Sequence, residues 1–77
     1  MRFISGEYAR IKIYGKYHNC EVIKVKNNFV TVCFEDRLYL GKVALSKNGN
    51  EYAVGSIEVK GDDIIRAPFF VINTITI

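Results

Sequence analysis

The stretch that decides the fold is residues 22–33, with the sequence VIKVKNNFVTVC. Apolar and polar side chains alternate on both sides of Asn27-Asn28, which is typical of two strands joined by a two-residue turn. Asparagine tolerates the positive backbone φ angles that such a turn requires. The register that follows pairs apolar side chains across the hairpin: Val25 with Val30, Ile23 with Val32, and Val22 with Cys33.

The same alternation continues along a chain of 77 residues, which is short enough for one domain, residues 1–77. Isoleucine, valine and threonine total 21 residues, and these β-branched side chains favour strands over helices. We expect tight turns at Gly15-Lys16, Asp36-Arg37 and Asn48-Gly49. The expected strands are residues 7–14, 18–26, 29–35, 38–46 and 51–60, then a short element at 64–67 and a final strand at 69–77.

A second set of apolar side chains lies on the opposite face of these strands, and it includes Ala9, Ile11, Cys20, Leu40 and Ile57. The apolar pattern changes face near Gly41 and Gly55, which the expected register places nearly opposite each other. Facing glycines allow strands to bend or bulge. The sequence therefore predicts an all-β fold, a small and partly open barrel of five to six mostly antiparallel strands in a meander. The alternative is a flat sheet whose second face is buried by a partner subunit.

Positive charge is concentrated in the first part of the chain. Residues 10–47 carry eight lysines and arginines against three acidic residues, whereas residues 48–77 carry two against four. This asymmetry favours an anionic partner. We find no secretory signal and no apolar run near the roughly 20 residues that span a bilayer, so we expect a cytoplasmic protein with reduced thiols and no membrane partner. The abundance of lysine, isoleucine and asparagine suggests a bacterial or phage source.

The segments Gly6–Ile11, Gly15–Val22 and Phe29–Asp36 together resemble the SH3-like barrel superfamily, in particular its Tudor and KOW branches. The resemblance implies a binding module for peptides, proteins or nucleic acid. It also implies that Gly61–Ala67 forms the one-turn helix that precedes the last strand in such barrels. Tyr8, Tyr14 and Tyr17 are the candidates for an aromatic cage, although the tryptophan of many such cages is absent and the glycine-centred KOW motif is incomplete.

Residues suited to catalysis or metal binding are few. The single histidine, His18, has no serine or cysteine at a spacing typical of a catalytic triad, so we expect no enzymatic activity and no cofactor. His18, Cys20 and Cys33 lie on neighbouring strands, but a fourth ligand and the paired-cysteine spacing of zinc sites are missing. We therefore expect no metal, and we interpret both cysteines as small buried thiols.

Alternating cations and aromatic rings form the best candidate binding site. Lysine and arginine contact phosphates, and exposed rings stack on bases. We expect the Gly15-Lys16 turn to place Arg10 opposite Glu21, which would neutralise part of this charge. The candidate ligand-binding residues are Tyr8, Arg10, Lys12, Tyr14, Lys16, Tyr17, Lys24, Lys26 and Phe29.

The C-terminal strand is uncharged and strongly β-prone, and an exposed edge of this kind promotes aggregation. It therefore pairs either within the barrel or across an interface between subunits or with a partner. In the second case the chain is a homo-oligomer or binds another protein through this strand. The candidate interface residues are Phe69, Phe70, Ile72, Ile75 and Ile77.

Three hypotheses for function follow from these observations. The first is a non-enzymatic module that binds nucleic acid through the basic and aromatic residues. The second is a protein-interaction module or a small inhibitor, of phage origin in one version, that covers the surface of a partner protein. The third is an oligomer that sequesters a small anionic ligand such as a nucleotide.

Overall fold

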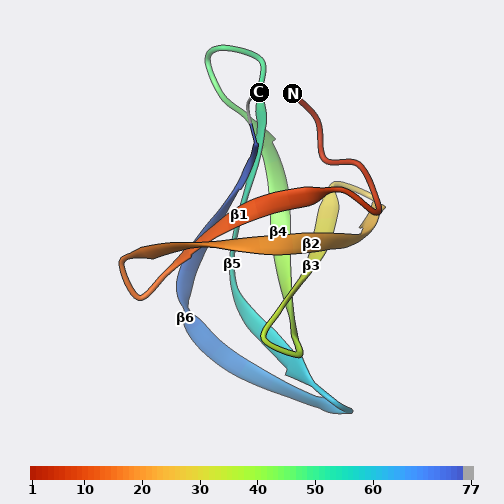
Figure 1. The fold of residues 1–77 in the computed structure, drawn as a ribbon, viewed down its shortest axis with the longest axis vertical. Coiled ribbons are helices and arrows are strands. Elements are labelled where there is room, and N and C mark those ends of the chain that lie inside the picture. Colours follow the sequence, from red (N-terminus) through yellow and green to blue (C-terminus); the bar gives the residue numbers. More distant parts are fainter. Residues whose placement is uncertain (76–77) are drawn as a thin grey trace.

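Six antiparallel strands follow one another around a closed ring in the computed structural model, which describes residues 1–75 (Figure 1). Each strand pairs with the next along the chain, and the last pairs with the first. The prediction of a small all-β barrel is confirmed, and its ring is closed rather than partly open. The strands are β1 (Tyr8–Ile13), β2 (Lys16–Lys26), β3 (Phe29–Phe34), β4 (Arg37–Leu45), β5 (Glu51–Lys60) and β6 (Asp63–Thr74).

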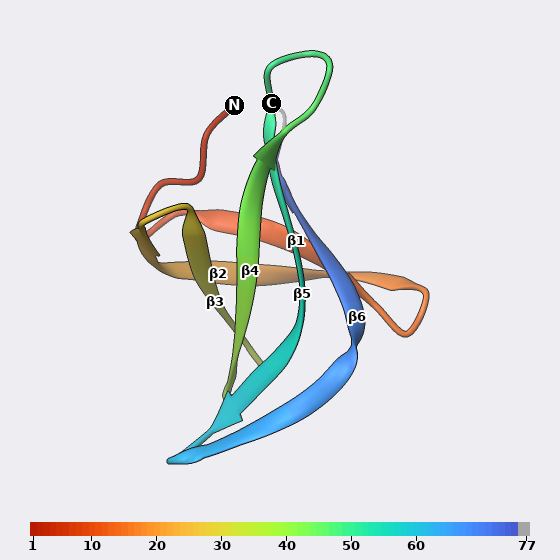
Figure 2. The ribbon, with the colours of Figure 1, turned by 180° about the vertical axis from the view of Figure 1, so that it is seen from behind.

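β6 closes the ring by pairing with β1 on one side and with β5 on the other (Figure 2). Ile72 lies opposite Ile11 in one pairing and opposite Ala53 in the other. Within the described residues, this strand therefore pairs inside its own barrel, as one of the two alternatives predicted. Among residues 1–75 there is no helix with the length and apolarity needed to span a membrane.

The expected one-turn helix at Gly61–Ala67 is wrong. Lys60 pairs with Asp63 around a tight turn in which Gly61 has a positive φ angle, and residues 64–67 already belong to β6. β6 continues through Pro68 to Thr74, and its register with β5 shifts in this region, between Gly55 and Ile57. A proline is tolerated there because its missing N–H donor is not required where the ladder is irregular.

Three of the four predicted turns differ from the structure by one residue. The first and third turns are Tyr14-Gly15 and Glu35-Asp36, and all four of these residues have positive φ angles. In the fourth, the Ser46 N–H donates to the carbonyl oxygen of Asn50 at 2.8 Å, which leaves a three-residue loop that ends at Gly49. A three-residue loop with a glycine of positive φ is a common hairpin connection.

A bulge at Ile23 changes which residues of β2 face the interior. The register shifts between Val22 and Lys24, so that Val22 pairs with Val32 and Glu21 pairs with Cys33. The predicted pairs of Val22 with Cys33 and of Ile23 with Val32 are therefore wrong, and Ile23 is exposed. The sequence shows apolar residues on both faces of this strand. The bulge changes which face points inward, so that apolar residues from both faces contribute to the single interior of the barrel.

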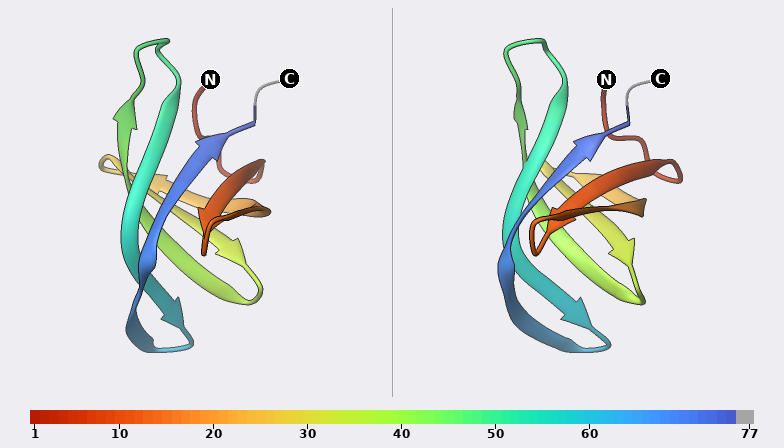
Figure 3. Two further views of the ribbon diagram at one scale, coloured as in Figure 1. Left: turned by 90° about the vertical axis from the view of Figure 1, so that its left-hand side faces the viewer. Right: turned by 60° about the vertical axis from the view of Figure 1, so that its left-hand side comes forward.

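The glycines at the predicted bend lie where neighbouring strands leave no room for a side chain. A Cβ atom on Gly55 would meet the carbonyl oxygen of Leu40 and the ring of Phe70, and one on Gly41 would lie 2.8 Å from the Cβ atom of Ala53. The register between β4 and β5 shifts at this level. The prediction that facing glycines bend the sheet here is confirmed, and below the bend the β5–β6 hairpin extends beyond the ring (Figure 3).

The interior is filled by small and β-branched side chains with two phenylalanines and one tyrosine. Phe3, from the segment before β1, is part of this core, and the Gly6 N–H donates to the carbonyl oxygen of Val22 to hold that segment in place. The buried hydrophobic residues are Phe3, Ala9, Ile11, Ile13, Cys20, Val22, Val30, Val32, Tyr39, Ala53, Phe70 and Ile72.

Candidate nucleic-acid interface

The outer surface of β1 and β2 carries the first group of candidate residues. Because Ala9, Ile11 and Ile13 face the interior, the alternate residues of β1 face outward, and Lys12 lies opposite Tyr17 of β2. The Tyr17 ring centroid lies 4.9 Å from the Arg10 guanidinium carbon and 5.3 Å from Lys12 Nζ. These cation–π contacts hold both cations over one ring. The structure therefore brings together Tyr8, Arg10, Lys12 and Tyr17.

The predicted pairing of Arg10 with Glu21 is wrong. The turn at Tyr14-Gly15 shifts the register by two residues, so Arg10 lies opposite Asn19 and Glu21 lies opposite Tyr8. In the described part of the chain, the only ion pair joins Arg37 to Glu58. The Arg10 charge is consequently not neutralised by a carboxylate in residues 1–75.

Tyr14 and Lys16 are the two candidates that the structure separates from this group. Tyr14 lies in the turn and is strongly exposed. Lys16 lies opposite Ile13, so it belongs to the alternate set of β2 residues that includes His18 and Cys20, and it is exposed because it is at the end of the barrel. Lys16 therefore does not share the outward face of Tyr17.

The second group lies at the other end of β2, on its hairpin with β3. Lys24 is opposite Thr31 and Lys26 is opposite Phe29, as predicted. Together with Asn27 these four residues line a shallow pocket of about 350 Å³. This volume is at the small end of the range of about 300–1,000 Å³ for ligand pockets. The hairpin is held to β4 because the Val43 N–H donates to the carbonyl oxygen of Asn28 at 2.7 Å.

Sequence reasoning missed Lys42. On β4, Lys42 is directly opposite Phe29, so the Phe29 ring is flanked by Lys26 on one neighbouring strand and by Lys42 on the other. The expected turn at Asp36-Arg37 concealed this pair by placing Ala44 opposite Phe29. We use the term basic face for the outward residues Tyr8, Arg10, Lys12, Tyr17, Lys24, Lys26, Phe29 and Lys42.

Glu21 is the acidic residue within the basic face, and it separates the two groups along β2. From Tyr17 to Lys26 the strand advances nine residues, which corresponds to about 30 Å of extended chain. A ligand in contact with both ends of this surface must be of comparable length. An extended polyanion meets that requirement, and a single small anion does not.

The histidine and the two cysteines do not form a metal site. His18 packs against Phe34, with ring centroids 4.6 Å apart. Burial raises the pKa of the Cys20 thiol from 9.0 to about 12, so Cys20 is protonated and unsuited to metal binding at neutral pH. Residues 1–75 contain no cluster of three or more histidine, cysteine or acidic side chains that could hold a metal ion.

A polar cluster closes the end of the barrel near Phe34. Arg37 Nη1 donates to both carboxylate oxygens of the buried Glu58, at 3.3 and 3.2 Å. Burial, together with the nearby Glu58 carboxylate, raises the pKa of Tyr39 above its ordinary value, and the hydrogen bond to Glu58 raises that of Arg37. Glu58 is thus an ion-paired structural residue, which its position in an alternating strand did not reveal.

The predicted interface on the C-terminal strand needs correction. Phe70 and Ile72 face the interior and are fully buried, so neither offers surface to a partner of the folded barrel. Phe69 is 67% exposed and remains available. Ile75 is half-buried and lines a shallow pocket with Met1 and Tyr8. Ile77 lies outside the described residues.

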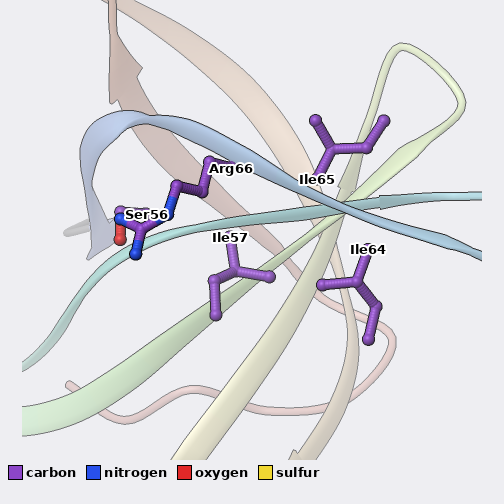
Figure 4. Close-up of a pocket in the computed structure, with 5 residues that line it drawn as sticks. All are labelled: Ser56, Ile57, Ile64, Ile65 and Arg66. Carbon is purple, nitrogen blue, oxygen red and sulfur yellow. The ribbon is translucent and has the colours of Figure 1, made fainter.

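A second surface feature is an apolar pocket of about 290 Å³ on the protruding β5–β6 hairpin (Figure 4). Ile57 and Ile64 lie on one side of the hairpin and Ile65 on the other, with Arg66 beside Ser56. Ile64 is 77% exposed. By register, Leu38, Leu40 and Val59 share the face of Ile57 and Ile64.

Comparisons with protein-family models, with curated proteins and with solved structures found no match to this chain.

Proposed function

We propose that this barrel is a non-enzymatic module that binds nucleic acid through its basic face. The observation that carries the proposal is that five cations face outward from β1, β2 and β4 beside exposed rings, and that none of the five is ion-paired within residues 1–75. Phosphates attract unpaired lysines and arginines, and bases stack on exposed rings. The five cations are Arg10, Lys12, Lys24, Lys26 and Lys42.

Two features favour a polyanion over a small ligand. The basic face extends from Tyr17 to Lys26 along β2, which is about 30 Å of extended chain and a length that a nucleic-acid strand can follow. The pocket at Phe29 is shallow and open, whereas sites for small molecules enclose most of the ligand surface.

The proposal is tested by fluorescence anisotropy with a labelled oligonucleotide of about 12 nucleotides, single-stranded and as a duplex, at about 50 mM salt. Lys12→Ala and Lys26→Ala should each weaken binding about threefold or more, because each removes one phosphate contact. Glu21→Gln should strengthen binding, because it removes the acidic residue of the basic face. The matched control is Lys60→Ala on the protruding hairpin, which should change little.

The sign of the Glu21 effect makes the test specific. A structural role for Glu21 would predict weaker binding in Glu21→Gln, through loss of stability, and a thermal unfolding curve of the same protein would reveal that. Absence of binding to both oligonucleotides, or an equal loss in Lys12→Ala and Lys60→Ala, would overturn the proposed function.

The apolar face of the β5–β6 hairpin supports a second candidate function, self-association into a dimer. Exposed apolar patches are typical of protein contacts. Arg66 lies beside this face, and Asp62 lies in the turn at the hairpin tip. Two hairpins packed antiparallel about a two-fold axis would bring Arg66 of each copy near Asp62 of the other, so the surface is self-complementary in charge.

Light scattering coupled to gel filtration tests this second candidate. A dimer predicts a mass that rises from 8.8 kDa toward twice that value with increasing concentration. Ile64→Lys should keep the protein monomeric and, since Ile64 is exposed, folded. A mass of one chain at every concentration would reject the dimer and leave the basic face unaffected.

A further inference from the structure

We propose that Phe29 and the lysines around it form a subsite for one unpaired nucleotide, so that the ligand of the basic face is single-stranded. This inference rests on the proposed function and specifies its substrate class. The base would stack on the Phe29 ring, and the lysines Lys24, Lys26 and Lys42 would contact the adjacent phosphates.

The first step of the argument is that two rings of the basic face differ in availability. Arg10 and Lys12 both lie over the Tyr17 ring. No cation and no other ring lies over Phe29 among residues 1–75, although three lysines surround it. Tyr17 therefore orients two cations, whereas the Phe29 ring, which is 49% exposed, has a free face.

The second step concerns the positions of the lysines. Lys26 and Lys42 are the direct cross-strand neighbours of Phe29 on β2 and β4, and such neighbours have Cβ atoms about 5 Å apart. A base stacked on the ring has its backbone on one side or the other, so a lysine is in position in either case. Asn27 lines the same pocket and supplies an amide that can donate to a base edge and accept from it.

The third step distinguishes single strands from duplexes. A stacking ring needs an unpaired base, because paired bases in a duplex present only their edges in the grooves. The pocket is formed on the outer surface of a closed barrel, where the Phe29 ring faces outward and can be reached by an unpaired base. The Asn27-Asn28 turn is fixed by the hydrogen bond to Val43, so the ring is presented on a rigid support.

The absence of tryptophan from the chain permits a direct test. Phe29→Trp introduces a single tryptophan whose fluorescence reports stacking. The control is Phe69→Trp, because Phe69 is the other strongly exposed phenylalanine and lies on β6, the strand opposite β3 in the six-stranded ring. Addition of single-stranded oligothymidine at low salt should quench the tryptophan of Phe29→Trp and not that of Phe69→Trp.

The affinity of substituted proteins completes the experiment. Phe29→Ala should weaken binding of the single strand about tenfold or more, Phe29→Tyr should retain it, and Phe69→Ala should leave it unchanged. The wild-type protein should bind the duplex at least about tenfold more weakly than the single strand. Equal affinity for both forms, or equal quenching in the two tryptophan variants, would overturn this inference and leave the proposed function standing. Absence of binding to either form would overturn both.

Discussion

At the scale of single residues, two side chains have roles that differ from those expected from their chemical type. Cys20 is a reactive residue type, yet it faces the interior opposite Ala9 and is 2% exposed. Glu58 is acidic, yet it is buried and bound by Arg37. The alternation of β2 turns Cys20 inward, and the register shift between Gly55 and Ile57 turns Glu58 inward on β5. The environment then decides the chemistry, because burial disfavours the charged thiolate and a cation stabilises the buried carboxylate.

The raised pKa of Cys20 predicts a specific loss of stability in alkaline solution. The folded thiol keeps its proton up to about pH 12, whereas the thiol of the unfolded chain loses it near the ordinary value of 9.0. Above pH 9 the unfolded state therefore binds fewer protons, and the free energy of unfolding falls as the pH rises toward 12. Between pH 8 and pH 10 the loss from this residue is about 1.4 kcal/mol.

Urea denaturation of the wild-type protein and of Cys20→Ala at pH 8 and pH 10 measures this contribution. The wild-type protein should lose about 1.4 kcal/mol more than the variant between the two values, because the other titrating groups are common to both proteins. The same loss in both proteins would show that Cys20 is not shielded from solvent as the structure indicates.

At the scale of the elements, the sequence is sufficient to locate the strands, and it is insufficient to fix their register. When the register between two paired strands shifts by two residues, the same side chains still face inward, so the alternation of apolar residues cannot distinguish the two registers. The turns at Tyr14-Gly15 and Glu35-Asp36 were each predicted one residue too late, and this error shifts the register of the hairpin by two residues. The inward faces were therefore predicted correctly, while the partner of Arg10 was not.

A shift of one residue has a different consequence. The three-residue loop that ends at Gly49 puts Ala53 of β5 inward, whereas the expected two-residue turn would have put Tyr52 and Val54 inward. The bulge at Ile23 reverses the faces of β2 in the same manner. Bulges and loop lengths depend on how the ring closes, which is a tertiary constraint. Lys42 was missing from the predicted site for the other reason, because the two-residue slip of the β3–β4 register placed Ala44 opposite Phe29.

The bend in β5 depends on Gly55, and this predicts a large effect of one added methyl group. The Cβ atom in Gly55→Ala would collide with the backbone of Leu40 and with the buried Phe70 ring, so we expect a destabilisation of about 3 kcal/mol or more. The matched control is Gly49→Ala, where no atom lies within 4 Å and only the positive φ of 80° opposes alanine. That variant should lose about 1–2 kcal/mol in urea denaturation. Equal losses would contradict the close approach of β4, β5 and β6.

At the scale of the whole molecule, closing the ring leaves an open strand edge on β6 within residues 1–75. Residues 63–70 of β6 pair with β5 alone, whereas residues 71–74 also pair with β1. The pairing of β6 with β1 reduces the aggregation hazard that the C-terminal sequence presents, since the backbone donors and acceptors of residues 71–74 are used on both sides. A partner therefore binds side chains around the ring and can extend the sheet at the β5–β6 hairpin. The available side chains divide into the basic face and the apolar face of the β5–β6 hairpin.

This division predicts how binding responds to salt. If all five cations of the basic face contact phosphates of a single strand, the logarithm of the association constant should fall with the logarithm of the salt concentration with a slope of about −3.5. Between about 50 and 200 mM salt the affinity should then decrease about 100-fold. Removing one cation, as in Lys42→Ala, should reduce the slope by about 0.7. Phe29→Ala should lower the affinity without changing the slope, because stacking releases no counterions. Anisotropy titrations at four salt concentrations separate these effects, and a slope near zero would mean that the ligand binds elsewhere, with the apolar face as the remaining surface.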